Sequence, residues 1–173
     1  AAGGKGGAVA IFRPAAAFEK VQDMAEDQED SSVLLNFKAH RKWVSGVYFP
    51  CAAKNPTGTL LYSSADDGLI KLWDISKQHK GMPKLVYTAD HIHGKGIFSM
   101  DGKGSYLVTG SKDKSVNVSS IGEDGQLDSV ARFFDHSKVV KCVAVCSHEE
   151  EEGSSGFSSY SLVASGGDDG RAA

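Results

Sequence analysis

Residues 63–74 read SSADDGLIKLWD, and this stretch decides the fold class of the chain. An apolar run, Leu60-Leu61-Tyr62, comes directly before it, and an Asp-Asp-Gly turn divides it. After the turn, the residues alternate toward Trp73. Short apolar or alternating runs bounded by turn residues are typical of β-strands. The stretch therefore predicts two short strands joined by a tight turn.

The same arrangement occurs three times in the chain. Each copy places a hydroxyl four residues before an aspartate, in the pairs Ser63 and Asp67, Thr109 and Asp113, and Ser165 and Asp169. A histidine precedes each pair, and apolar residues follow it at offsets of seven and nine; these histidines are His40, His91 and His136. The offset-four residue is apolar after His40 and His136 but is Lys95 after His91, which leaves His93 as an alternative. A pattern that recurs three times along the chain with the same internal spacing indicates an architecture built from structural repeats.

Between the turns, the chain consists of short runs rich in Val, Ile, Leu, Tyr and Phe. The predicted strands are 8–13, 32–38, 44–49, 59–64, 69–75, 84–88, 95–100, 105–110, 115–121, 128–134, 139–146 and 160–165. Evenly spaced short strands with turn residues at fixed offsets predict an all-β repeat fold.

These residues resemble a WD40 repeat, whose blades are four-stranded antiparallel sheets of a β-propeller. The resemblance covers nearly the whole chain. It implies a hydrogen-bonded network of a loop histidine, a strand hydroxyl, a turn aspartate and a tryptophan. The implied residues are His40, Ser63, Asp67 and Trp73; His91, Thr109 and Asp113; and His136, Ser165 and Asp169. Ser119 stands where the second tryptophan is expected, and the third repeat stops before that position. In a fourth, partial match, Gly6 replaces the aspartate and Phe12 the tryptophan.

The resemblance implies an incomplete propeller of about three blade-equivalents. Its parts are a trailing half-blade at 8–38 with an acidic linker at 14–31, blades at 39–90 and 91–135, and a truncated blade at 136–173 with an acidic, serine-rich loop at 147–159. Propellers typically need four to eight blades to close. We therefore expect an internal piece of a larger propeller, with a ring of several copies as the alternative. Both acidic segments are expected to be solvated loops, or else docking sites for a basic partner.

Composition excludes several classes of protein. With 40% hydrophobic residues, 24% charged residues and a net charge of −3, the chain lacks the basic character of a dedicated nucleic-acid binder. The sequence contains no apolar run of about eighteen residues, so no membrane span is expected. Three cysteines without a signal peptide favour a reducing compartment, and the expected location is intracellular, in the cytoplasm or the nucleus.

Catalytic, metal and cofactor motifs are not predicted. The glycine-lysine-glycine sequences at 94–96 and 102–104 lack the spacing of a phosphate loop and are expected to form turns. His91 and His93 lack two further identifiable ligands for zinc. The spacing of Cys142 and Cys146 fits neither a zinc knuckle nor a redox motif. We therefore expect a protein that is not an enzyme and uses no cofactor.

The resemblance implies a scaffold that binds other proteins or peptides through the loops at one face of the propeller. The candidate contact residues are Lys42, Trp43, Asp66, Lys112, Lys138 and Asp168. One alternative is a substrate receptor of a cullin-type ubiquitin ligase, in which an arginine commonly follows the Trp-Asp pair by two positions; here that position is Ser76. A second alternative is a propeller that recognises chromatin or nucleic acid, for which the basic residues are few.

Overall fold

The computed structural model describes residues 2–3, 6–12, 33–76, 82–148 and 160–173. All of its regular structure is β, and the described residues form no helix. The strands are β1 (Ala2–Gly3), β2 (Ala8–Phe12), β3 (Val33–Lys38), β4 (Val44–Tyr48), β5 (Leu60–Ala65), β6 (Ile70–Asp74), β7 (Lys84–Ala89), β8 (Ile97–Lys103), β9 (Tyr106–Ser111), β10 (Val116–Ile121), β11 (Leu127–Phe133), β12 (Val140–His148) and β13 (Tyr160–Gly167). The predicted all-β fold is confirmed.

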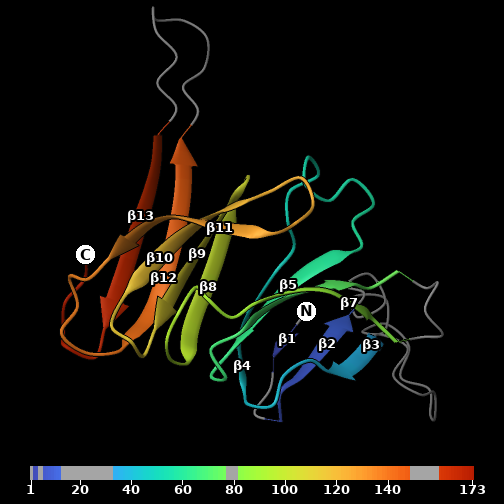
Figure 1. Cartoon of the computed structure of the whole chain (residues 1–173), viewed down its shortest axis with the longest axis horizontal. Helices are drawn as coiled ribbons and strands as arrows, with labels where there is room; N and C mark the ends of the chain where they lie inside the picture. The colour runs from blue at the N-terminus through green and yellow to red at the C-terminus, as the bar shows by residue number, and fades with distance from the viewer. Residues whose placement is uncertain (1, 4–5, 13–32, 77–81, 149–159) are drawn as a thin grey trace, which may run out of the picture.

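The strands form four antiparallel sheets in which sequence neighbours pair. The orders are β1-β2-β3, β4-β5-β6-β7, β8-β9-β10-β11 and β12-β13. Figure 1 shows the sheets side by side, from the blue β2–β3 pair to the red β12–β13 pair. The first strands β4, β8 and β12 pack next to one another, so successive sheets meet along these strands. This is the arrangement of propeller blades. The division into two whole and two partial blades stays a prediction.

Bulges mark equivalent positions in the sheets. The pairing of each sheet's last strand with the strand before it shifts register at Leu72/Trp73 in the second sheet, at Val118/Ser119 in the third and at Ile11/Phe12 in the first. Phe12, Trp73 and Ser119 therefore occupy the same place, as the sequence alignment implied. Their environments differ, because Trp73 is 7% exposed whereas Phe12 is 44% exposed.

Apolar side chains fill the space between successive sheets. The second and third sheets share the largest cluster, which contains Tyr62, Leu72, Ile97, Leu107 and Leu127. The Tyr62 hydroxyl of β5 donates a hydrogen bond to the carbonyl of Gly125, in the turn before β11, and so ties the two sheets together. Burial raises the pKa of Tyr62 well above its usual range, so this hydroxyl keeps its proton. Because one face of each sheet is buried, the alternation read in the sequence fixes which side chains enter the core.

Several strand bounds differ from the predicted ones. The strand predicted at 95–100 begins at Ile97 and ends at Lys103. Gly96 lies instead in the preceding loop, where a Cβ would stand 2.2 Å from Asp66 Oδ1 of the second sheet. The pair β12–β13 extends to His148 and Gly167, and β1 was not predicted. The linker at 14–31 and most of the loop at 147–159 lie outside the described residues.

Candidate functional site

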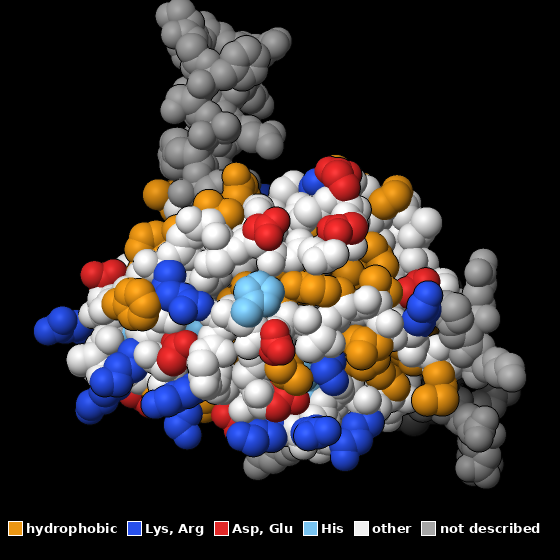
Figure 2. All heavy atoms as spheres, viewed as in Figure 1, with side chains coloured by type: hydrophobic (Ala, Val, Ile, Leu, Met, Phe, Trp, Pro, Cys, Tyr) orange, Lys and Arg blue, Asp and Glu red, His pale blue; other side chains and the backbone are white. Residues whose placement is uncertain are grey.

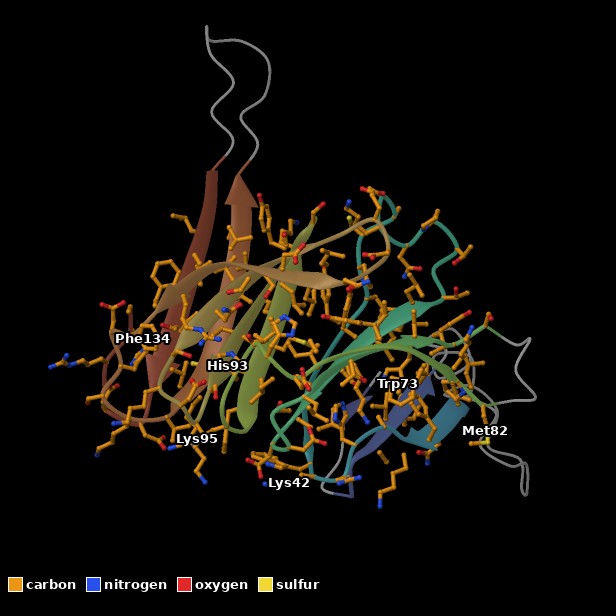
Figure 3. The ribbon with its side chains drawn as sticks, in the orientation of Figure 1. Lys42, Trp73, Met82, His93, Lys95 and Phe134 are labelled. Carbon is orange, nitrogen blue, oxygen red and sulfur yellow. The ribbon has the colours of Figure 1, made fainter. Side chains whose placement is uncertain are left out.

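The second sheet contains the complete hydrogen-bonded network that the resemblance implied. His40, in the loop before β4, lies with Nδ1 3.1 Å from both carboxylate oxygens of Asp67 and with Nε2 2.8 Å from Ser63 Oγ. Trp73 donates its indole N–H to the same hydroxyl oxygen at 2.9 Å. The network therefore connects a loop, a strand, a turn and the next strand. Figure 3 shows Trp73 inside the molecule, within its sheet.

The donors and acceptors fix the protonation state of this network. An ionised Asp67 can only accept, so His40 Nδ1 donates to it, and in the neutral imidazole Nε2 is then the acceptor for the Ser63 hydroxyl. His40 is neutral in this arrangement. Burial lowers the pKa of His40, although the nearby charge of Asp67 acts in the opposite direction. Asp67 also accepts the backbone N–H groups of Arg41 and Leu69.

In the third sheet, His93 occupies the loop position, and the prediction of His91 needs correction. His93 lies with Nδ1 3.0 Å from Asp113 Oδ2 and Nε2 2.9 Å from Thr109 Oγ1. The side chain of His91 is 54% exposed and 3.9 Å from Asp90. The sequence contained the deciding signal: Ile97 follows His93 by four residues, as Val44 follows His40. Those residues begin β8 and β4.

Small polar groups replace the missing tryptophan of the third sheet. Ser119 donates its hydroxyl to the Asn117 side-chain carbonyl at 2.8 Å, and the Asn117 amide donates to Ser129 Oγ at 2.6 Å. Although burial alone would raise the pKa of Asp113, hydrogen bonds from Ser115 and His93 lower it to about 2. The turn carboxylate is thus ionised and fully engaged even without a tryptophan.

The fourth sheet repeats the first half of the network. His136 lies with Nδ1 3.1 Å from Asp169 Oδ1 and Nε2 2.9 Å from Ser165 Oγ. Burial alone would raise the pKa of Asp169, but the Ser137 backbone N–H and the His136 side chain lower it below its usual range. In all three repeats, the histidine, hydroxyl and aspartate hold the loop against the turn. The geometry is that of a structural clamp.

The loops at this end of the sheets form one surface, which we call the loop face. It consists of residues 39–43, 66–69, 90–96, 112–115, 135–139 and 168–171. The predicted contact residues Lys42, Trp43 and Asp66 meet there: Lys42 Nζ is 3.4 Å from Asp66 Oδ2, and the Asp66 N–H donates to the Trp43 carbonyl at 3.1 Å.

The other predicted contact residues lie in neighbouring loops of the same face. Lys112 is exposed, and its backbone N–H donates to the Gly96 carbonyl at 2.9 Å. Lys138 is exposed in the loop before β12, and Asp168 lies 3.5 Å from Lys141. Lys138 and Asp168 therefore lie in the loops on either side of the fourth sheet's strands, whereas Lys112 lies in a turn of the third sheet.

A polar recess of about 670 Å³ opens on the loop face between the second and third sheets. Its lining includes Lys42, Asp66, Asp90, His93, Lys95 and Lys112. In Figure 3, Lys42 and Lys95 lie at the lower edge of the molecule, and His93 lies further inside. Figure 2 shows Lys and Arg side chains gathered along that edge. The recess is therefore lined by charged groups from two adjacent sheets.

An aromatic contact next to the recess was missed by sequence reasoning. Trp43 packs edge-on against Phe98 of β8, with ring centroids 5.2 Å apart, and Trp43 remains 38% exposed. Lys141 of β12 places its ammonium 4.4 Å from the Phe98 ring centroid. In the sequence, Phe98 was noted only as the apolar residue seven positions after His91, and His91 is not the clamp histidine.

In the described part of the chain, no group of three or more His, Cys, Asp or Glu side chains could hold a metal ion. No helix there has the length and hydropathy of a membrane span. None of the three cysteines takes part in a disulfide.

Comparisons with known proteins agree with this geometry. Residues 31–74 and 84–118 match the family model "WD domain, G-beta repeat". A computationally designed protein, Ika4, has a solved structure that aligns with a TM-score of 0.55 and 20% sequence identity, over 82% of this chain and 70% of that one. This likeness concerns the fold alone.

Three relatives come from plants. A LEC14B homolog of Prunus armeniaca is 33% identical over 93 residues, which is 53% of this chain and 18% of that protein. The LEC14B protein of Lithospermum erythrorhizon is 30% identical over 93 residues, 53% of this chain and 19% of that protein. LIN-1 of Lotus japonicus, provisionally named as an E3 ubiquitin-protein ligase, is 36% identical over 63 residues, 36% of this chain and 4% of that protein. The chain thus spans less than a fifth of the length of these relatives.

Proposed function

Because the chain belongs to the WD40 repeat family, we propose that it is a non-catalytic scaffold that binds other proteins through its loop face. The fold by itself leaves the function open, so the proposal depends on the surface. One observation supports it above the others. The exposed Trp43, in contact with Phe98, stands beside a recess lined by charged groups of two sheets. Partly exposed aromatics among polar groups are the usual anchors of protein interfaces.

The candidate contacts of the scaffold are Lys42, Trp43, Asp66, Lys112, Lys138 and Asp168. None of these side chains belongs to the histidine clamps, and Trp43 and the lysines expose much of their surface. The clamps hold the backbone on either side of them. A rigid backbone that presents exposed side chains suits the recognition of a peptide or protein surface.

A photo-cross-linking experiment tests this proposal. A benzoylphenylalanine is placed at Lys138 on the loop face, or at Lys103 at the opposite end of β8, and the chain is irradiated in an extract of its source cells. We expect defined protein adducts from position 138 and few from position 103, with loss of the former when Trp43→Ala is added. Equal adducts from both positions would contradict a loop-face scaffold. Thermal unfolding of each variant controls for misfolding.

A second candidate function is substrate reception for a cullin-type ubiquitin ligase. The similarity to LIN-1 over 63 residues favours it. The test is ubiquitin transfer in immunoprecipitates of the chain, supplied with activating and conjugating enzymes. Ubiquitin chains on a co-precipitated protein, lost with Trp43→Ala, would support the receptor role. Photo-cross-linked adducts without ubiquitin transfer would contradict the receptor role and would support a scaffold that only binds other proteins.

We further propose that the protein acts inside the cell. Three cysteines that form no disulfide, two of them exposed on β12, are compatible with a reducing compartment. Fractionation of the cell with an antibody to the chain would check this. Recovery from the medium or a secretory compartment would contradict it.

A further inference from the structure

The three equivalent turns of the loop face differ in charge. Two of them read Asp66-Asp67-Gly68 and Asp168-Asp169-Gly170. The third sheet has Lys112-Asp113-Lys114 at the same place. The middle aspartate, which each clamp needs, is kept, while the residues on both sides become lysines. The formal charge of the turn changes from −2 to +1.

The second of these lysines adopts a backbone conformation that lysine disfavours. Lys114 has φ of +76°, whereas Gly68 and Gly170 hold the equivalent positions at +82° and +75°. The left-handed conformation is unfavourable for any residue that has a Cβ atom, whereas glycine adopts it without steric strain. Lys114 is the only non-glycine residue with positive φ among the described residues. The fold alone would favour glycine here, so the lysine points to a use for its charge.

Neighbouring carboxylates do not neutralise these lysines. Asp113 is engaged by His93, by Ser115 and by the Gly94 N–H. Asp66 pairs with Lys42. In the part of the chain that the structure describes, no carboxylate lies within 4.0 Å of the ammonium groups of Lys95, Lys112 or Lys114.

Lys95 places a third such charge beside this turn. Lys95 and Lys112 both line the recess between the second and third sheets, and both are exposed. The backbone joins their loops, since the Lys112 N–H donates to the Gly96 carbonyl at 2.9 Å. We call Lys95, Lys112 and Lys114 the lysine corner. Figure 3 shows Lys95 directed outward at the lower edge, where Figure 2 shows basic side chains.

We propose that the lysine corner binds an anionic side chain, a carboxylate or a phosphate, on an acidic segment of a partner protein. The inference rests on the proposed scaffold function and names the chemistry of its ligand. The ammonium groups of Lys95 and Lys112 at the polar recess, with Lys114 two residues beyond Lys112, attract such a segment and give it charge-assisted hydrogen bonds. Trp43, which is 38% exposed and packs against Phe98, follows Lys42 of the recess in the chain and is available to the apolar residues of the segment.

The three turns themselves supply the variant that separates binding from folding. Lys112→Asp with Lys114→Gly gives the third turn the residues of its sister turns and changes the net charge by −3. A matched control, Lys103→Asp with Lys84→Gln, changes the net charge equally at exposed positions at the opposite ends of β8 and β7. The turn variant is expected to unfold at the same temperature as the parent chain or higher, because the left-handed lysine is gone.

Binding is measured by fluorescence anisotropy with three labelled peptides. They have the same apolar residues and carry four glutamates, four phosphoserines or four glutamines. We expect the anionic peptides to bind the parent and control chains alike, more weakly as salt rises. The turn variant should bind them at least about tenfold more weakly, as loss of charge-assisted hydrogen bonds implies. If both anionic peptides bind, a carboxylate is sufficient as the ligand of the lysine corner. If only the phosphorylated peptide binds, the ligand is a phosphate.

Three results would overturn the inference. One is equal binding of the glutamine peptide. Another is an equal loss of affinity in the turn variant and the control, which would indicate unspecific attraction. The third is preference for a single-stranded oligonucleotide over both anionic peptides. Loop-face adducts that persist without anionic-peptide binding would leave the scaffold function standing. Peptide binding without adducts at position 138 would instead refute the scaffold function.

Discussion

At the scale of single residues, one hydroxyl joins the parts of each clamp. Ser63 Oγ accepts the Trp73 indole N–H and lies 2.8 Å from His40 Nε2, and all three residues are buried. Buried polar groups are stable only while their hydrogen bonds are made, since water cannot replace a lost partner. The described residues contain no buried side-chain nitrogen or oxygen without a partner. Each clamp is therefore sensitive to the loss of any one member.

Replacing Ser63→Ala should destabilise the fold markedly. The change leaves the Trp73 N–H and His40 Nε2 without partners, and each unsatisfied buried group costs about 1–3 kcal/mol. We expect the free energy of unfolding to fall by about 3 kcal/mol in urea denaturation. Ser45→Ala is the control, because Ser45 is half-buried and its hydroxyl forms a hydrogen bond with the hydroxyl of Ser64 instead of joining a clamp. Equal losses in both variants would show that Ser63 has no special role.

The two buried neutral histidines make stability depend on pH. Burial lowers the pKa of His40 and of His93 below the ordinary value of about 6.5. As the pH falls through 6.5, the unfolded chain takes up protons that the folded chain does not, so the free energy of unfolding falls. We expect the melting temperature to decline between pH 7.5 and 5.5.

Two variants check which histidines are responsible for this decline. His91→Gln should leave it intact, since His91 is exposed, whereas His40→Gln should reduce its slope. A melting temperature that stays constant or rises as the pH falls would contradict the assignment.

At the scale of elements, the turns after β5, β9 and β13 show how local backbone demands and function compete. All three use a left-handed residue after the clamp aspartate, at positions 68, 114 and 170. Two use glycine, which adopts this conformation at no steric cost. The third uses Lys114 and keeps the same turn, because the hydrogen bonds of Asp113 hold it.

Replacing Lys114→Gly should stabilise the fold by about 1 kcal/mol, because it relieves a left-handed conformation. The reciprocal change Gly170→Lys should destabilise it by a similar amount. A Cβ at position 170 meets no atom within 4 Å, so only the backbone conformation is tested. Both changes are measured by urea denaturation. Stabilisation by the reciprocal change would refute this reading of the turns.

At the scale of the whole molecule, the second and third sheets come close together at the loop face. A Cβ at position 96 would lie 2.2 Å from Asp66 Oδ1 and 2.7 Å from the Asp66 carbonyl. The glycine thus allows the third sheet to reach the turn of the second. The same approach shapes the recess, because Asp66 and Gly96 both line it. Sheet packing and the candidate site therefore depend on one contact.

Gly96→Ala should move the second and third sheets apart. Overpacking against backbone costs about 1–3 kcal/mol, and we expect a loss of that size in the free energy of unfolding. Gly94→Ala is the matched control, because a Cβ at Gly94 meets nothing within 4 Å and its φ is not positive. If both variants were equally stable, the close approach of the sheets would be wrong.

The repeat spacing by itself predicted the all-β fold, and the family resemblance carried by the same residues implied the four-stranded sheets and most members of the clamps. This was possible because strands, turns and clamps are local patterns, and the apolar alternation fixes which face of each strand is buried. The choice of His93 over His91 depended on the offset of four residues to Ile97. The sequence contains this offset, but the apolar residues at offsets seven and nine after His91 favoured the wrong histidine.

Only the tertiary structure decided the features that join different sheets. The contact of Trp43 with Phe98, the approach of Gly96 to Asp66 and the recess lined by Lys95 and Lys112 link residues of successive sheets. Their positions depend on how the sheets pack, and no local spacing encodes that packing. The left-handed backbone of Lys114 also became visible only in the structure, because a lysine in a sequence gives no sign of positive φ. The residues of each clamp turn thus determine its local conformation, whereas the packing of the sheets determines which groups of the neighbouring sheet lie beside it.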